Sequence, residues 1–196
     1  MFDFNKDYIL ENDKVKLIPL KHSDYENLVQ FAIEEPELWT YSLMQANSSE
    51  KIKAYIEHAL KARDEKKEYP FIVFDKTTNR FAGSTRFYDI QLNNESLQLG
   101  FTWYGKDFQG TGLNKNCKFL LLEFAFEILN MQRVEFRADN ENKRSIAAMK
   151  SIGCVEEGIL RSNSPKVDGG RRDSIVLSIL KEEWESSVKK NLYLKL

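Results

Sequence analysis

A short glycine-bearing segment, residues 109–114, has the composition of a phosphate-binding turn. It reads Gln109-Gly110-Thr111-Gly112-Leu113-Asn114, between a strand-like run at 97–104 and a helical run at 113–129. A glycine turn at a helix start directs backbone N–H groups outward, and the helix dipole favours an anion there. The segment therefore predicts a site for a pyrophosphate-bearing cofactor that needs no basic side chain.

A second polar segment opens a predicted helix at 142–152. Asn142 stands at its start, Ser145 lies in its first turn, and Gly153 follows its last residue, where glycine commonly ends a helix. Each residue alone has a plain structural interpretation: Asn142 is a helix cap, and Ser145 is a first-turn serine without a chemical role. Only their co-occurrence with the glycine turn suggests a site.

The elements that must hold these segments follow from the spacing of apolar residues. The predicted strands are 15–20, 71–74, 81–90, 97–104, 133–138, 154–160 and 173–180. The predicted helices after the glycine turn are 113–129, 142–152 and 181–188. The order is antiparallel strands followed by β-α-β-α-β, which predicts an α/β (α+β) fold with a mixed sheet in a single domain, 1–196.

Three local expectations are specific. Ser23 and Glu26 have capping-box spacing, which predicts a helix start there. Ser48 or Ser49 caps a second helix, whose inward residues are Ile52, Tyr55, Ile56, Ala59 and Leu60. Along the strand at 97–104, the residues predicted to share one face are Leu97, Leu99, Phe101 and Trp103.

The bulk composition narrows the function classes. The chain has 196 residues, of which 42% are hydrophobic, and a formal net charge of −1. This balance disfavours binding to nucleic acid or to an anionic membrane, which usually needs a basic excess. No signal peptide and no bilayer-spanning run are expected. Cys117 and Cys154 lack partners at metal or redox spacing, so we expect reduced thiols, no metal site and a cytoplasmic protein.

With these parts in place, the chain resembles the GNAT superfamily of acetyl-CoA-dependent N-acyltransferases, and within it the RimJ/RimL-like branch. The resemblance covers nearly all of the chain and is strongest over 97–184. Gln109, Gly112 and Asn114 occupy the three marked places of the family pattern Gln/Arg-x-x-Gly-x-Gly/Ala, with Asn114 replacing the usual small residue. Three later segments resemble the family's Asn-x-x-Ser helix, the strand after it, and its last strand and tail: 139–153, 157–161 and 170–184.

The resemblance implies transfer of an acetyl group from acetyl-CoA to a primary amine, by direct attack in a ternary complex. It also implies a sheet that is splayed between the fourth and fifth strands, with the coenzyme in the opening. Ser145 and Asn142 are then the catalytic candidates, with Ser145 as thiol partner or proton donor and Asn142 orienting the thioester. The residues that the resemblance assigns to coenzyme binding are Trp103, Tyr104, Gln109, Gly110, Thr111, Gly112, Leu113, Asn114, Asn142 and Ser145.

Several features of the reaction stay open at this level. Many family members carry a tyrosine as general acid on the helix equivalent to 142–152, and this helix has none. His22 and His58 lie on predicted helices away from the turn, and a water relay or no dedicated base fits equally well. Other candidates for the base are Tyr88, Asp89 and Glu95. The sequence decides neither the acceptor, a protein N-terminus or a small-molecule amine, nor whether the protein is a homodimer.

Two other classes of function compete with the enzyme. A catalytically silent, CoA-binding regulatory module is consistent with the absent tyrosine and the unassigned base. An unrelated α/β nucleotide binder is disfavoured, because no Walker lysine follows Gly112 and an antiparallel meander precedes the turn.

Overall fold

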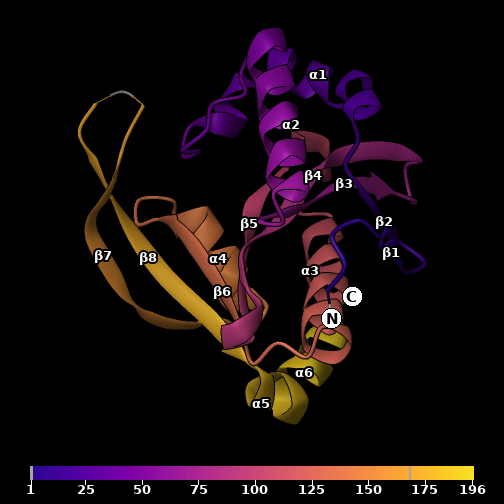
Figure 1. Ribbon diagram of the computed structural model, residues 1–196, viewed down its shortest axis with the longest axis vertical. Coiled ribbons are helices and arrows are strands. Elements are labelled where there is room, and N and C mark those ends of the chain that lie inside the picture. The colour runs from indigo at the N-terminus through magenta and orange to yellow at the C-terminus, as the bar shows by residue number, and fades with distance from the viewer. Residues whose placement is uncertain (1, 168) are drawn as a thin grey trace.

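One mixed sheet organises the molecule (Figure 1). The computed structural model describes residues 2–167 and 169–196. Within them, eight strands follow the order β1-β2-β3-β4-β5-β6-β8-β7, and all neighbours are antiparallel except β5 and β6, which are parallel. The strands are β1 Leu10–Glu11, β2 Val15–Pro19, β3 Tyr69–Asp75, β4 Arg80–Gln91, β5 Ser96–Tyr104, β6 Arg133–Asp139, β7 Val155–Pro165 and β8 Arg171–Leu180.

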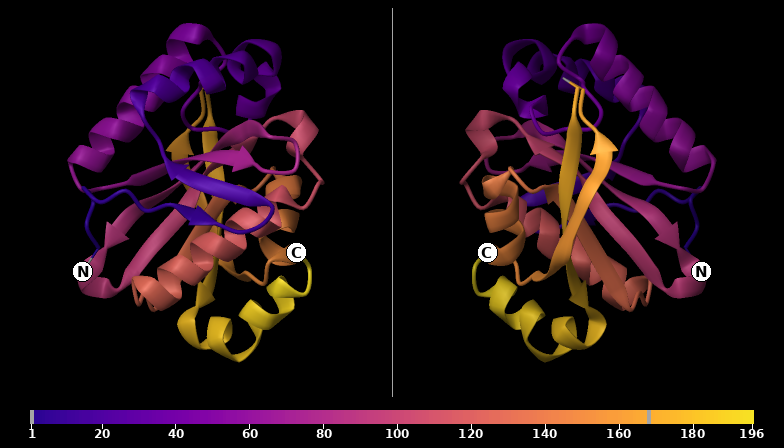
Figure 2. Two further views of the ribbon diagram at one scale, coloured as in Figure 1. Left: turned by 90° about the vertical axis from the view of Figure 1, so that its right-hand side faces the viewer. Right: turned by 90° about the vertical axis from the view of Figure 1, so that its left-hand side faces the viewer.

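Helices cover both faces of this sheet. The α-helices are α1 Tyr25–Glu34, α2 Ser49–Asp64, α3 Leu113–Glu123, α4 Lys143–Ser151, α5 Lys181–Glu183 and α6 Lys189–Tyr193. Figure 2 shows α1 and α2 at one end of the molecule and the C-terminal helices at the other. Each described helix is too short or too polar to cross a lipid bilayer.

Two hydrophobic cores lie on opposite faces of the sheet. The larger core joins α3 to the strands through side chains such as Leu97, Leu121 and Phe136. The smaller core lies beneath α1 and α2, where Trp39 and Trp103 pack with their ring centroids 4.9 Å apart. The sequence pattern of apolar residues therefore supplies the burial that holds both helical layers to the sheet.

The second helix follows its prediction closely. Ser48 is its N-cap, and the Ser48 hydroxyl accepts a hydrogen bond from the Lys51 N–H (3.3 Å). Of the predicted inward residues, Ile52, Tyr55, Ile56 and Ala59 are buried, whereas Leu60 is half-buried. The capping serine and the helical spacing of the stripe thus confirm α2.

The predicted cap of the first helix is wrong: the N-cap of α1 is Asp24, one residue after Ser23. Lys21 has extended backbone angles and its N–H donates to the Asp24 carboxylate (2.9 Å), which begins a short 3₁₀ turn, His22–Asp24, before α1. Ser23 makes no cap. Because an ionised carboxylate accepts a backbone N–H more strongly than a hydroxyl does, Asp24 sets the start instead.

The predicted single face of β5 is also wrong, because the strand contains a β-bulge. Ser84 pairs with Trp103 and Arg86 pairs with Gly100, so β5 holds one residue more than β4 between these pairs. Phe101 takes a left-handed conformation at φ 49°. Leu97 therefore joins the core under α3, whereas Trp103 joins the core under α1 and α2. An extra residue reverses the side-chain alternation after the bulge.

Two helical runs continue past their α-helical parts. The run predicted at 113–129 is α3 followed by a π-helical turn, Phe124–Ile128. The run predicted at 181–188 begins with α5, widens into a second π turn, Trp184–Val188, and continues as α6. Trp184 is fully buried and its indole N–H donates to Glu127 (2.8 Å), which joins the two π turns.

The parallel strands β5 and β6 part after a short paired segment. Their ladder comprises Ser96↔Arg133, Leu97↔Val134 and Gln98↔Glu135. Beyond Gln98, β5 pairs only with β4, and beyond Glu135, β6 pairs only with β8. The predicted splay between the fourth and fifth strands is confirmed. The predicted fourth and fifth strands are numbered β5 and β6 in the structure, because the two-residue strand β1 precedes them and was not predicted from the sequence.

The last two strands form a long hairpin, which extends from the body of the molecule in Figure 1. The predictions at 154–160 and 173–180 located both strands but ended the first too early and began the second too late, because polar residues continue the ladder. Near the end of the hairpin, Arg172 Nη1 donates to the backbone carbonyl of Tyr41 (3.5 Å) in the segment between α1 and α2.

Candidate active site

The glycine turn at the start of α3 requires glycine for its backbone shape. Gly110 has φ 80° and Gly112 has φ 91°, both in the left-handed region that β-carbon sterics disfavour. A β-carbon built at either position would meet no atom within 4 Å. Crowding by this chain therefore does not select glycine, and the space above the turn is open.

The first turn of α3 presents backbone donors to that space. Gly112 is the N-cap and offers no side chain, so the first intrahelical bond runs from Asn116 N–H to the Gly112 carbonyl (3.2 Å). Leu113 is buried in the core and holds the helix down, whereas the Asn114 side chain is half-buried and makes no hydrogen bond within the described residues. In this first turn the Leu113 N–H donates to the Thr111 hydroxyl (3.4 Å), so the N–H groups of Asn114 and Lys115 are available to an anion.

Side chains of the turn brace it rather than extend from it. Gln109 Nε2 donates to the Tyr104 carbonyl (2.7 Å), which fastens the turn to the end of β5. The Thr111 hydroxyl donates to the Phe108 carbonyl (2.9 Å) and lies 3.4 Å from the Leu113 nitrogen. The Thr111 hydroxyl proton is therefore engaged within the turn, and the anion site consists mainly of backbone.

The side chains of Trp103 and Tyr104 enter opposite cores because neighbouring strand residues face opposite sides of the sheet, and the bulge decides which core each one joins. Trp103 packs under α1 and α2, while Tyr104 lies in the core under α3, where burial raises its pKa well above the ordinary value. Neither aromatic ring faces the gap between β5 and β6. Only the backbone of these two residues lies along that gap, as an added extended ligand requires.

The second predicted segment forms the start of α4. Asn142 Oδ1 accepts a hydrogen bond from the Ser145 N–H (3.0 Å), so Asn142 is the N-cap. The Ser145 hydroxyl is half-buried and has no hydrogen-bond partner among residues 2–167 and 169–196. Asn142 thus has a structural role as the cap of α4, and Ser145 has a free hydroxyl in the first turn of that helix.

These parts meet at one edge of the sheet. Because β5 and β6 are parallel, their C-terminal ends lie at the same edge, and α3 and α4 each begin just beyond. Both helices pack into the same core, to which α3 contributes Leu121 and α4 contributes Ile146. The arrangement offers an anion site, an unpaired strand edge and a free hydroxyl around one opening, which suits an extended ligand with a phosphate end and a reactive end.

Comparison with known proteins identifies the family to which this arrangement belongs. The profile of the GNAT acetyltransferase domain matches residues 14–155, which include the glycine turn, the parted strands and α4. The chain belongs to the GNAT family of acetyltransferases. The RimJ/RimL-like branch is supported by relatives and solved structures whose names include RimJ and ribosomal N-acetyltransferase.

Three similar proteins illustrate how far the likeness extends. "Putative ribosomal N-acetyltransferase YdaF" of Bacillus subtilis (strain 168) is 33% identical over 103 residues, which are 53% of this chain and 55% of that protein. The chain thus spans about half the length of this curated relative. The crystal structure of a putative acetyltransferase from T. thermophilus is 32% identical, covers 100% of both chains and has a TM-score of 0.87. Mycobacterium smegmatis RimJ in complex with CoA-disulfide shares the fold, with a TM-score of 0.80 at 20% identity over 96% of this chain and 93% of that chain.

This GNAT domain carries a buried charge that the sequence analysis missed. Lys118 on α3 is only 5% exposed, and its Nζ donates to Thr102 Oγ1 on β5 (2.7 Å). Burial lowers the pKa of Lys118 to about 8. In the structure all residues from Asn116 to Leu122 are buried, so α3 is covered on every side and a lysine within it is unusual, but the sequence carries no local signal of this burial.

The face of the sheet opposite α3 is polar around the gap. Asp89 accepts hydrogen bonds from Gln98 Nε2 (2.7 Å) and Gln91 Nε2 (3.0 Å), which occupy its carboxylate. Burial raises the pKa of Tyr88 to about 12, so this phenol stays protonated at neutral pH and does not act there as a base. The Gln98 Oε1 atom is buried without a partner among the described residues.

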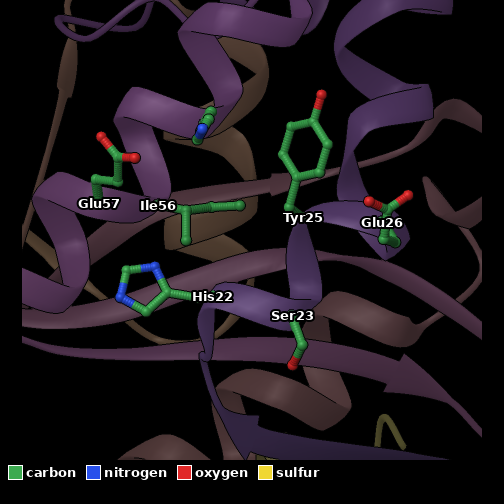
Figure 3. A pocket seen from close by; sticks show the side chains of 7 residues that line it. His22, Ser23, Tyr25, Glu26, Ile56 and Glu57 are labelled. Carbon is green, nitrogen blue, oxygen red and sulfur yellow. The ribbon is translucent and has the colours of Figure 1, made fainter.

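The two histidines lie away from the gap. His22 lines a shallow hollow with Tyr25, Glu26 and Glu57, between the first 3₁₀ turn and α2 (Figure 3). His58 lies on the exposed side of α2. In the part of the chain that the structure describes, no group of three or more His, Cys, Asp or Glu side chains is placed to hold a metal ion.

Proposed function

We propose that this protein transfers an acetyl group from acetyl-CoA to a primary amine, by direct attack of the amine in a ternary complex. The single observation that supports this most is the parting of β5 from β6 after Gln98, with the starts of α3 and α4 at the open end. The gap offers a strand edge without a partner, which a pantetheine arm can fill. The continuous sheet also supports treatment of 1–196 as one domain.

In this proposal each part of the coenzyme has a place. The pyrophosphate binds the backbone donors of 109–114, with the dipole of α3 behind them. The pantetheine arm runs along the free edge of β5 beside Trp103 and Tyr104. A backbone N–H there polarises the thioester carbonyl, a contribution of about 3 kcal/mol in comparable oxyanion sites. Asn142 and Ser145 face the thioester from the start of α4.

The chemistry demands little of a general base when the acceptor is weakly basic. An α-amine has a pKa of about 7.7–8.0, so roughly one in ten is neutral at pH 7. A lysine amine, with a pKa near 10.4, is neutral in only about one in two thousand. A protein N-terminus or another weakly basic amine therefore fits a site without an assigned base. Because the relative YdaF is named a putative ribosomal N-acetyltransferase, peptides that carry ribosomal-protein N-termini form a first panel to test.

The test combines binding and turnover. Calorimetry with acetyl-CoA measures binding without knowledge of the acceptor, and release of free thiol measures turnover against a panel of peptides, polyamines, amino acids and aminoglycosides. We expect binding and thiol release that depend on one class of amine. Binding without release across the whole panel would favour the silent regulatory module. Absence of binding by the folded protein would refute the proposal.

A further inference from the structure

The buried side chain of Lys118 lies between the two parted strands. Its Nζ is 2.7 Å from Thr102 Oγ1 on β5 and 5.9 Å from the ring centroid of Phe136 on β6. Phe136 is the first β6 residue beyond the β5–β6 ladder, and Thr102 follows the bulge in β5. The ammonium thus lies near the narrow end of the opening, on the side of the sheet covered by α3.

The partners of this ammonium are both neutral: it donates one hydrogen bond to a hydroxyl and makes a cation–π contact with the Phe136 ring. No carboxylate of the described residues lies within 4.0 Å of it, and its one hydrogen bond runs to Thr102, whose hydroxyl is 2.7 Å from that of Thr85. Burial of a charge is costly unless an opposite charge compensates for it. A lysine that merely filled this space would be replaced at a gain by an apolar residue. Its presence indicates that something electron-rich faces it when the gap is filled.

The other ionisable groups around Lys118 are neutral at neutral pH. Cys117 on α3 and Cys154 after α4 both have a pKa of about 12, raised by burial. The charged residues of β6, Glu135 and Arg137, alternate with Phe136 and so belong to the other face of the sheet. The protein itself therefore supplies no close negative charge to Lys118 from its described residues, and a ligand in the gap must do so.

We propose that the Lys118 ammonium faces the sulfur of the bound coenzyme and donates a proton to the thiolate as it departs. This inference rests on the proposed function. The amine nitrogen attacks the thioester carbon, and the carbonyl π electrons move to oxygen. On collapse the carbonyl re-forms, the C–S bond breaks and sulfur keeps its electron pair. Nζ gives its proton to that sulfur, the amine proton passes to water, and Lys118 regains a proton from solvent.

The assignment explains two features of this chain together. The helix α4 has no tyrosine to serve as general acid, and the Ser145 hydroxyl is a neutral donor that supports a hydrogen bond rather than a charge. A donor with a pKa of about 8 also matches a thiol with a pKa of about 8.5, so proton transfer is nearly balanced in free energy. Below pH 8 most of the donor carries its proton.

The decisive measurement needs no acceptor amine. CoA is bound to the protein and its thiol is titrated by thiolate absorbance, with desulfo-CoA as the blank. The raised pKa values of Cys117 and Cys154 keep the protein's own thiols silent below pH 10 or so. In the unchanged protein we expect the bound thiol to have a pKa about one unit or more below that of free CoA. Lys118→Met should abolish this depression.

Two matched variants separate the charge from packing. Lys190→Met removes an exposed lysine on α6 and should leave the depressed thiol pKa unchanged. Thr102→Val removes the hydroxyl partner but keeps the ammonium, and should retain most of the depression. If Lys118→Met does not fold, the thiol pKa is measured in Lys118→Gln instead. An unaltered thiol pKa in the variant that folds would overturn the proposal.

Kinetics provide the second arm once an acceptor is known. Lys118→Met should lower kcat about 100-fold, as the loss of a general acid does, with KM for acetyl-CoA changed less than about 3-fold. The wild-type kcat/KM should fall as pH rises through about 8, and the variant should lack that fall. An acetyl group found on Lys118 by peptide mass would also overturn the proposal, because it would make the residue a nucleophile. Absence of CoA binding by the unchanged protein would instead refute the proposed function.

Discussion

At the scale of single residues, the two turn glycines give the sharpest test of the anion site. Gly112→Ala adds a methyl group that touches nothing in this chain but points into the open space above the turn, at φ 91°. We expect affinity for acetyl-CoA to fall about 10-fold or more, since backbone donors must approach the phosphates closely. Titration calorimetry measures the affinity of each variant for acetyl-CoA.

The hairpin supplies a matched control for that substitution. Gly169 has φ 89°, and a β-carbon added there would also meet no atom within 4 Å, but this glycine lies outside the turn. Gly169→Ala should share the backbone strain of about 1 kcal/mol and leave coenzyme affinity unchanged. Equal affinities for the two variants would show that the turn does not bind phosphate.

Lys118 makes a second prediction, on stability rather than turnover. Its pKa falls from an ordinary value of 10.5 to about 8, so its charge costs the folded protein about 3 kcal/mol at pH 7. Between pH 8 and 10.5 the unfolded chain binds more protons, so stability rises with pH there. Lys118→Met should be more stable at pH 7 and should lose that rise. Urea titrations at several pH values would measure the free energy of unfolding at pH 7 and its dependence on pH. A less stable variant at pH 7 would contradict this account.

Ser145 is the third residue whose role can be separated from structure. Its hydroxyl has no partner in the described chain, so Ser145→Ala should not change the urea midpoint appreciably. We expect turnover to fall about 10-fold while acetyl-CoA affinity changes little, because the hydroxyl serves the reacting sulfur. Steady-state kinetics decide the point, and an unaltered kcat would remove Ser145 from the proposed mechanism.

At the scale of elements, α4 combines a cap with a proposed ligand contact. Asn142→Ala should destabilise the protein by about 1 kcal/mol, because the Ser145 N–H loses its acceptor. Asn142→Ser keeps a capping oxygen and should restore stability, but it lacks the amide that we place beside the thioester. A raised KM for acetyl-CoA in Asn142→Ser would support both roles. A normal KM would leave Asn142 as a cap alone.

Elements also show what the sequence could and could not predict. Ser48 and the stripe from Ile52 onward are local signals, and α2 follows them. The bulge at Phe101 is not local, since it depends on the register between β4 and β5, and it reverses the face of Trp103. The site segments were found through residue types and family resemblance. Lys118 was not, because burial on all sides of α3 arises only when the sheet and α6 have packed around it.

At the scale of the whole molecule, the short β5–β6 ladder predicts strong stabilisation by the coenzyme. A ligand bound only to the folded state adds about 2.7 kcal/mol at one hundred times its Kd. We expect CoA to raise the thermal midpoint and to slow hydrogen exchange chiefly in β5, β6 and the first turn of α3. Exchange measured with and without CoA checks this, and protection confined to α1 and α2 would place the coenzyme elsewhere.

The same short ladder has a consequence for how the chain is made. Strands β2 to β5 each pair with the strand before them in sequence, so this meander can assemble while the later residues are still being synthesised. The junction with β6 must wait until α3 has crossed over, and β8 must emerge before β6 gains its second neighbour. A nascent chain stalled before β8 would therefore leave β6 paired on one side only, with the edge that later receives β8 exposed.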